Sequence, residues 1–294
     1  MMASAFARSS IDTVINVRDN LIFTVSSMNP PTPGHVGVLI KRMMELAFTL
    51  REDNVYIFFG SDKYDSIDYP LSCEDREIAL NYMISYLKRL NPELNRINVI
   101  FMYEDGKNNG LLYFGEKLRQ YFSIAPGNTK KINGFFVAGG DDRLGMINNV
   151  RSIVGKNLQN FENGIVQVHL TRDETRNAKF ATGEFNPNDL SQISSTIVNK
   201  FVDSGDYGRF VDIYKGWLPP EQIEWLWSRL KAVRVKGPGT VSGADAAFPS
   251  MFTKTGTIMG HNPNRGGKRR KTIRRKHKSN KRKTIRKRRK IRRR

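Results

Sequence analysis

The sequence predicts an α/β protein with a doubly wound parallel sheet of about five strands, followed by C-terminal helices. Short apolar runs rich in β-branched residues recur along the chain, and stretches with helical periodicity separate them. The runs are apolar throughout rather than alternating, which is typical of strands buried on both faces. Strands joined by helices form parallel sheets with right-handed crossovers and helices on both faces.

Most of the predicted strands are followed by residues that favour a turn or a helix start. The first ends before an Asn-Pro-Pro-Thr-Pro-Gly stretch, the second at Gly60-Ser61-Asp62, and the fourth at Gly139-Gly140-Asp141-Asp142. The strands predicted in this way are residues 21–26, 55–59, 97–103, 135–138 and 165–170.

The other segments of this domain carry apolar residues at helical spacing. Ser72 followed by Asp75 forms a capping-box-like start for a long helix. Trp217, Trp225 and Trp227 fall on amphipathic stretches, so we expect them to pack in the core rather than to stack on bases. The predicted helices are residues 36–50, 72–90, 111–122, 142–150, 196–202, 207–217 and 219–233.

The net charge of +21 is concentrated at the C-terminal end of the chain. Residues 265–294 hold 20 of the 49 Lys and Arg and no acidic residue, which leaves 29 basic against 28 acidic residues elsewhere. From residue 236 the helical pattern gives way to Gly, Pro, Ser and Thr, a composition typical of linkers. The predicted organisation is an N-terminal extension (1–19), a folded domain (20–235), a flexible linker (236–264) and a disordered basic tail (265–294).

Composition also limits the classes of protein and the location. Cys73 is the only cysteine, which excludes an intramolecular disulfide and an all-cysteine metal site and fits a reducing compartment. No run approaches the ~20 apolar residues of a membrane span, and the first residues lack the apolar run of a secretory signal. We therefore expect an intracellular protein, cytoplasmic or nuclear, with no membrane partner.

Two short segments, about 160 residues apart, carry most of the functional information. Asn29-Pro30-Pro31-Thr32-Pro33-Gly34-His35 follows the first strand and opens a helix, and Ile193-Ser194-Ser195-Thr196 precedes another helix. Both bring small, hydroxyl-bearing or imidazole groups to a helix N-terminus, where unpaired N–H donors can hold a phosphate. The segments that follow strands one, two, four and five should share one crevice at the carboxyl ends of the strands.

These groups suit nucleotidyl transfer, in which a nucleophile attacks the α-phosphorus of an NTP and expels pyrophosphate. The protein mainly positions the reactants and neutralises charge on the phosphates. Gly34 would let the backbone approach the ligand, and His35 in the first helical turn would point back toward the phosphates. The Ser194–Thr196 turn would supply hydroxyl and N–H groups, and Lys200 a cation for the β- and γ-phosphates.

The two segments resemble the motifs of the nucleotidyltransferase (cytidylyltransferase-like) superfamily. Its members carry H-x-G-H after the first strand and an I-S-S-T-x-x-R-type motif before a late helix, and phage and large-DNA-virus members have N-P-P-T-x-G-H in the first position. The likeness spans roughly residues 21–220. It includes Pro70-Leu71-Ser72 with Glu74-Asp75-Arg76, Val137-Ala138-Gly139-Gly140-Asp141-Asp142-Arg143, and Arg172-Asp173.

The resemblance implies a Rossmann-like fold and a role for each matching residue. His35 would bind and polarise the α-phosphate, and Thr32 stands where many members have the first histidine. The family's Mg²⁺ would be held mainly by the NTP phosphates and water, so no metal ligand is assigned to the protein. The remaining residues implied are Asn29, Pro30, Gly34, Ser194, Ser195, Thr196, Gly139 and Asp141 for the nucleotide, and Asp62, Lys63, Arg76 and Arg172 for the acceptor.

One position departs from the family pattern, and a few residues also have a structural interpretation. The arginine that ends the second motif falls at Asn199, one residue before Lys200, and one helical position is a rotation of about 100°. Arg172 or Arg143 could compensate. Gly60-Ser61-Asp62 could be a plain turn, the pair Asp141-Asp142 could cap a helix, and Arg76 could form a surface ion pair.

The basic tail has three interpretations: a nuclear localisation signal, a nucleic-acid-binding arm, or a charged tail with no specific partner. It contains no aromatic residue for base stacking, so any contact with nucleic acid would be phosphate-driven, sequence-independent and steeply salt-dependent. In a viral protein, which the resemblance suggests, the arm could be packaged with the genome in the virion.

The sequence therefore leads to two hypotheses. In the first, the protein transfers a nucleoside monophosphate from an NTP to a small phosphorylated acceptor and releases pyrophosphate. AMP is slightly favoured over CMP, because some adenylyltransferases also have threonine at the position of Thr32. In the second, a catalytically weakened nucleotidyltransferase-fold protein binds or packages nucleic acid through residues 265–294.

Overall fold

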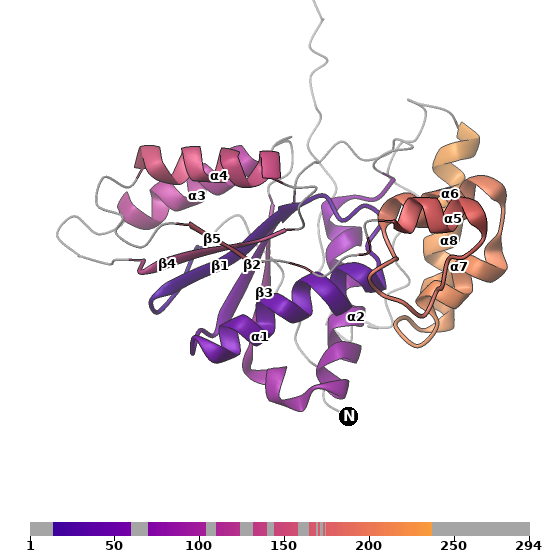
Figure 1. The fold of residues 1–294 in the computed structure, drawn as a ribbon, viewed down its shortest axis with the longest axis horizontal. Coiled ribbons are helices and arrows are strands. Elements are labelled where there is room, and N and C mark those ends of the chain that lie inside the picture. Colours follow the sequence, from indigo (N-terminus) through magenta and orange to yellow (C-terminus); the bar gives the residue numbers. More distant parts are fainter. Residues whose placement is uncertain are drawn as a thin grey trace, which may run out of the picture. The chain divides into compact units, whose positions relative to one another are not determined.

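The computed structural model describes a defined part of the chain (Figure 1). The predicted site residues Asp62, Lys63, Asp141 and Arg172 lie outside it, as do Arg143 and the basic tail. The described residues are 14–59, 70–103, 110–123, 132–139, 144–157, 165–168, 170, 173 and 175–236.

The strands form one parallel sheet in the order β3-β2-β1-β4-β5. In register, Phe23 of β1 lies opposite Tyr56 of β2 on one side and Val137 of β4 on the other. The chain runs outward from β1 to β3 and then returns to the far side of β1, so the strand order reverses between β1 and β4. This confirms the predicted doubly wound, Rossmann-like α/β class. The strands are β1 (Asn20–Ser26), β2 (Asn54–Phe59), β3 (Asn98–Met102), β4 (Gly134–Ala138) and β5 (Ile165–Val168).

Helices cover both faces of the sheet (Figure 1). Ile22 of β1 points to one face, and its neighbours Leu21 and Phe23 point to the other. Because both faces are covered, the strands are apolar throughout. The first face carries η1 (His35–Ile40), α1 (Lys41–Thr49) and α2 (Cys73–Leu90), and the second carries α3 (Gly110–Ser123) and α4 (Leu144–Asn157).

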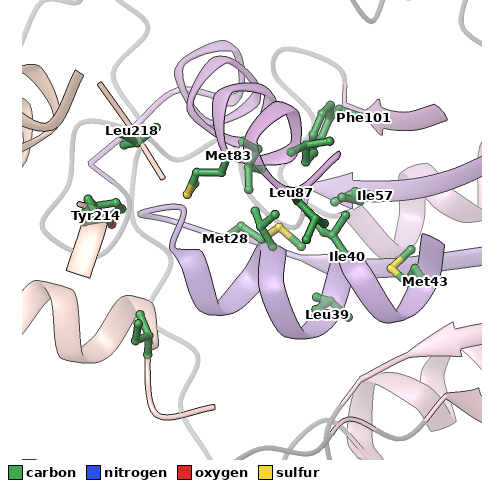
Figure 2. Packing of buried hydrophobic residues seen from close by; sticks show 14 of the residues in the cluster. Met28, Leu39, Ile40, Met43, Ile57, Met83, Leu87, Phe101, Tyr214 and Leu218 are labelled. Atoms are coloured by element: carbon green, nitrogen blue, oxygen red, sulfur yellow. The ribbon is translucent and has the colours of Figure 1, made fainter. Parts of the chain in front are cut away.

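The core of the first face extends into the C-terminal helices (Figure 2). Met28, Ile40 and Met83 belong to the same buried cluster as Tyr214 and Leu218. The C-terminal part of the chain is therefore joined to the loop after β1 by apolar packing, and the three tryptophans pack against this cluster as expected. These helices are α6 (Ser195–Ser204), α7 (Tyr207–Tyr214) and α8 (Pro220–Lys236).

The structure differs from the predicted elements in several places. The first helix begins with π-helical geometry over His35–Ile40 before it becomes α-helical, and the third and fifth strands are shorter than predicted. The structure also adds α5 (Arg176–Thr182) and the 3₁₀ helix η2 (Pro92–Arg96). Helix α5 has no buried residue, so it has no apolar stripe by which periodicity could reveal it. The predicted start of α2 is confirmed, because Ser72 Oγ accepts the Asp75 N–H at 3.0 Å.

Candidate active site

The two predicted motif segments are in direct contact beside the carboxyl end of β1. The Ser195 hydroxyl donates to the Pro30 carbonyl at 2.8 Å. A Cβ atom on Gly34 would lie 2.3 Å from the Ile193 carbonyl oxygen and 2.8 Å from that of Leu190. The glycine therefore allows two backbone segments to touch, whereas the sequence had suggested an approach to a ligand. The fold brings the N-terminus of α6 next to the start of η1.

The loop after β1 is held by side chains from other elements. The Asn29 side-chain amide donates to the Leu71 carbonyl at 2.8 Å, and its oxygen accepts the Leu71 N–H at 3.2 Å. The Tyr214 hydroxyl donates to the Pro31 carbonyl at 2.6 Å. Burial raises the pKa of Tyr214, so its hydroxyl stays protonated as this bond requires. Segments 70–72 and α7 thus fix the loop that carries His35.

His35 is buried, and its neighbour Thr32 fixes the orientation of its ring. The Thr32 N–H donates to His35 Nδ1 at 3.1 Å, and Thr32 Oγ1 lies 2.9 Å from the same nitrogen. A backbone N–H can only donate, so Nδ1 is the acceptor and the ring proton is assigned to Nε2. His35 is therefore a neutral imidazole whose Nε2–H can donate to an oxygen. The group that sets this tautomer is the backbone N–H of residue 32.

The start of α6 combines a capped helix end with N–H donors. The Ser194 hydroxyl accepts the Ile197 N–H at 3.4 Å and forms the N-cap. The N–H groups of Ser195 and Thr196 belong to the first turn and have no intrahelical partner. Thr196 is exposed. This helix end, with its positive dipole, can hold an anion next to the start of η1.

Residues further along α6 face the neighbouring helices. The Lys200 ammonium lies 4.8 Å from the centre of the Phe180 ring of α5. Asn199 Oδ1 accepts from Arg234 of α8 at 3.1 Å, and the same guanidinium pairs with Asp203. The Lys200 side chain thus points to α5, and the Asn199 side chain binds the guanidinium of Arg234 from α8.

Arg76 and Gly139 lie near the carboxyl ends of the strands but differ in what they do. Arg76 is fully buried, which excludes a surface ion pair. Its guanidinium lies 4.4 Å from the Phe59 ring centre and donates to the carbonyls of Ser27 and Ser72. It therefore anchors the end of β1, a role that the sequence did not indicate. The Gly139 N–H, directly after β4, donates to the Val168 carbonyl at 3.4 Å, beside the switch point of the sheet.

A partly buried polar pair near the end of β3 was not predicted. The Tyr103 hydroxyl donates to Glu77 Oε2 at 2.7 Å, and Glu77 lies on the inner side of α2. Burial, together with the Glu77 carboxylate, raises the pKa of Tyr103. The sequence did contain a signal for the burial of Glu77. This residue stands one helical turn after Cys73 and one before Leu80, on the apolar side of α2.

The described residues set limits on what else the site contains. They hold no group of three or more His, Cys, Asp or Glu side chains that could bind a metal ion by itself. None of the described helices is both long and apolar enough to cross a membrane.

No family model matches the chain, and no curated protein and no solved structure matches it. The fold and the site define an α/β protein of Rossmann-like topology with two helix starts in contact beside a neutral histidine.

Proposed function

We propose that the protein is a nucleotidyltransferase that transfers a nucleoside monophosphate from an NTP to a small phosphorylated acceptor and releases pyrophosphate. The observation that carries this proposal is the contact between the two motif segments, which sets His35 beside the N-terminus of α6. Two helix starts and a neutral imidazole donor at the end of β1 are suited to a chain of phosphates.

Each group has a separate task in this reaction. His35 Nε2–H would donate to an α-phosphate oxygen as negative charge grows there, and Thr32 keeps the ring in the required tautomer. The N–H groups of Ser195 and Thr196 would bind the pyrophosphate that leaves. Mg²⁺ would arrive with the triphosphate and neutralise part of its charge, and we assign no protein ligand to it.

The backbone of the loop supports a functional role. Met28, two residues after the end of β1, has a φ of 45° and is buried. A methionine in the left-handed region is unfavourable, and such conformations persist where the surrounding structure holds them, often at functional sites. The anchors at Ser27 and Asn29 flank this residue.

Several assignments remain predictions. Asp62, Lys63 and Arg172 for the acceptor and Asp141 for the nucleotide lie outside the described residues. The choice between adenylyl and cytidylyl transfer depends on the base-binding part of the crevice. Lys200 would act on the triphosphate only if its ammonium left the Phe180 ring.

The test is pyrophosphate release by the full-length protein with magnesium, with ATP, CTP, GTP and UTP offered against a panel of phosphorylated acceptors. We expect turnover with one pair, and a loss of about 10²- to 10³-fold in kcat for His35→Ala, since a transition-state donor is removed. Thr49→Ala, an exposed change at the end of α1, is the control and should retain the rate. Equal turnover in His35→Ala would contradict the proposal.

A second candidate function rests on the charge of residues 265–294 and on Asn199 in place of the motif arginine. The domain would then be a weakened scaffold, and the tail would bind nucleic acid through phosphates. Removal of residues 265–294 should abolish this binding, which should weaken steeply with salt, and His35→Ala should have no effect on it. If His35→Ala abolished the function of the protein and removal of residues 265–294 did not, the enzyme hypothesis would be favoured.

A further inference from the structure

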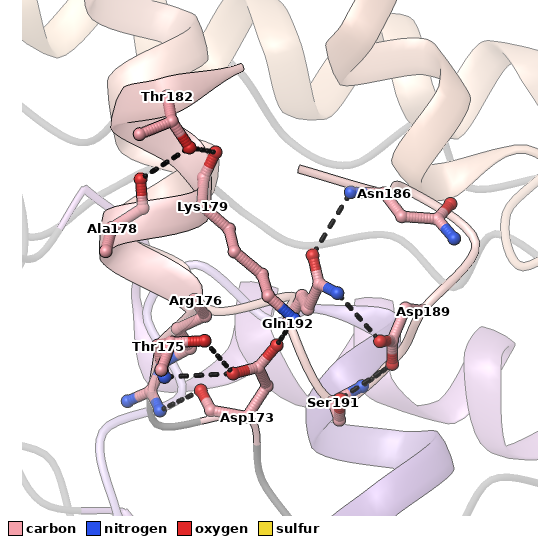
Figure 3. Close-up of polar contacts among 10 residues, drawn as sticks. All are labelled: Asp173, Thr175, Arg176, Ala178, Lys179, Thr182, Asn186, Asp189, Ser191 and Gln192. Atoms are coloured by element: carbon pink, nitrogen blue, oxygen red, sulfur yellow. Dashed lines mark hydrogen bonds and ion pairs between the residues drawn. The ribbon is translucent and has the colours of Figure 1, made fainter. Parts of the chain in front are cut away.

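A turn directly before α6 is organised by the Asp189 carboxylate (Figure 3). Asp189 Oδ1 accepts the N–H of Ser191 at 3.0 Å and its hydroxyl at 2.7 Å. The Asp189 carbonyl accepts the Gln192 N–H at 3.0 Å. These bonds fold residues 189–193 into one compact turn.

The buried side chain of Gln192 completes this turn. Its Nε2 donates to Asp189 Oδ2 at 2.8 Å, and its Oε1 accepts the Asn186 N–H at 3.1 Å. Because each end of the amide meets a partner of fixed polarity, only one orientation of the amide satisfies both. The carboxylate of Asp189 is the acceptor that this orientation needs.

The turn lies against the helix that begins with His35. A Cβ on Gly34 would lie 2.3 Å from the Ile193 carbonyl oxygen, and a Cβ on Gly37 would lie 2.3 Å from Leu190 Cδ1. Ser194, the cap of α6, follows immediately. The position of the turn therefore sets the distance between the His35 helix and the N-terminus of α6.

We propose that Asp189 is a positioning residue for the transfer reaction. Its carboxylate shapes the turn Leu190–Ile193, and the turn seats the N-terminus of α6 against the start of η1. Asp189 acts through this turn and not by contact with the substrate. This inference rests on the proposed function of the same site.

The contact between Asp189 and Gln192 can be tested by exchanging the carboxylate and the amide between the two positions. Asp189→Asn keeps an oxygen for Ser191 but turns an amide donor toward the Gln192 donor. Gln192→Glu sets a second carboxylate against Asp189. The double variant restores every bond, because the amide introduced at position 189 would donate to one oxygen of the carboxylate introduced at position 192, whose other oxygen accepts the Asn186 N–H. It also has the net charge of the wild type.

The measurement is kcat and KM for pyrophosphate release by the full-length single and double variants. We expect each single variant to lose about 10- to 100-fold in kcat/KM, as for a displaced catalytic group, and the double variant to recover to within about threefold. Asp53→Asn is the matched control, because this carboxylate pairs with Arg18 directly before β2 and has no contact with the turn among the described residues; it should stay within about twofold. Full activity in the single variants, or no recovery in the double variant, would overturn the proposal.

A second readout does not depend on turnover. The ¹⁵N signals of the His35 ring report its tautomer and surroundings, and they should shift in Asp189→Asn and return in the double variant. If the wild type transferred no nucleotide with any substrate pair, the proposed function would fail while this readout still decided the role of Asp189. Unchanged His35 signals in Asp189→Asn would refute that role.

Discussion

Gly34→Ala tests whether the contact between the two motif segments determines the site. Gly34 has φ −63° and ψ −35°, a helical conformation that alanine adopts without strain. The added methyl carbon would nevertheless lie 2.3 Å from the Ile193 carbonyl oxygen and 2.8 Å from that of Leu190. Both are backbone atoms, which cannot rotate away as a side chain can. The two segments must separate by roughly 1 Å to reach an ordinary van der Waals contact.

The expected effects follow from this displacement. Overpacking of this kind costs about 1–3 kcal/mol of unfolding free energy. A shift of about 1 Å between catalytic groups can lower the rate by roughly 100-fold. Urea unfolding measures the first effect, and kcat/KM for pyrophosphate release measures the second. The matched control is Gly145→Ala in the first turn of α4, where an added Cβ meets nothing within 4 Å.

Two results would refute this reasoning. If Gly34→Ala unfolded at the wild-type urea concentration and kept its rate, the contact at Ile193 would not set the geometry of the site. If Gly145→Ala lost as much stability as Gly34→Ala, the effect would belong to any glycine replacement in these helices. We expect Gly145→Ala to be at least as stable as the wild type, with a gain of up to about 1 kcal/mol from the better helix propensity of alanine.

Three further predictions concern stability and titration. Gln222→Met should raise the urea midpoint, with a gain of about 1–3 kcal/mol, because neither polar atom of this buried amide has a hydrogen-bond partner among the residues that the structure describes; an unchanged midpoint would contradict this. Glu52→Gln should lower the unfolding free energy by about 1.5–3 kcal/mol, because this buried carboxylate accepts three backbone N–H groups of the segment around the start of β1. Glu45→Gln, at a partly exposed carboxylate that makes surface ion pairs only, should change it by less than about 0.5 kcal/mol. The hydrogen bond from Lys179 lowers the pKa of Asp173 to about 2, so its contribution to stability is present above about pH 4 and is lost as the pH falls toward 2. Lys179→Met should return this pKa toward about 3.9 in a ¹³C NMR titration, and a value that stays near 2 would show that Lys179 is not the cause.

The parts of the fold that the sequence predicted are those with local signals. The strands could be recognised because both faces of the sheet are covered, and the start of α2 because Ser72 caps it through Asp75. Helix α5 carries no apolar stripe, so no local pattern distinguishes it from a loop. The π-helical start at His35 follows a loop that is fixed by partners far along the chain.

In the candidate site too, the contacts that the sequence did not predict come from distant parts of the chain. Arg76 lies near the start of a helix capped by Ser72 and is charged, so from the sequence a surface ion pair was one interpretation. It is buried because the Phe59 ring and the Ser27 carbonyl, which belong to another part of the chain, take up its guanidinium. Lys200 has the right charge for a triphosphate but stands one residue after the motif position, and its direction is set by Phe180 of a helix that the sequence did not predict. The local sequence shows which residue type stands at a position. The direction of its side chain depends on which elements of the fold pack beside it.

The composition of the loop after β1 explains why it needs the C-terminal helices. Pro30, Pro31 and Pro33 have no N–H, but they keep carbonyl acceptors in a loop that is largely buried. The donors for two of these carbonyls are hydroxyls, Ser195 of α6 and Tyr214 of α7. Ser195 therefore has a structural task apart from any bond to a phosphate. A loss of activity in Ser195→Ala would not identify a ligand contact, whereas the His35 ring is oriented within its own turn by Thr32, so its replacement tests the chemistry more directly.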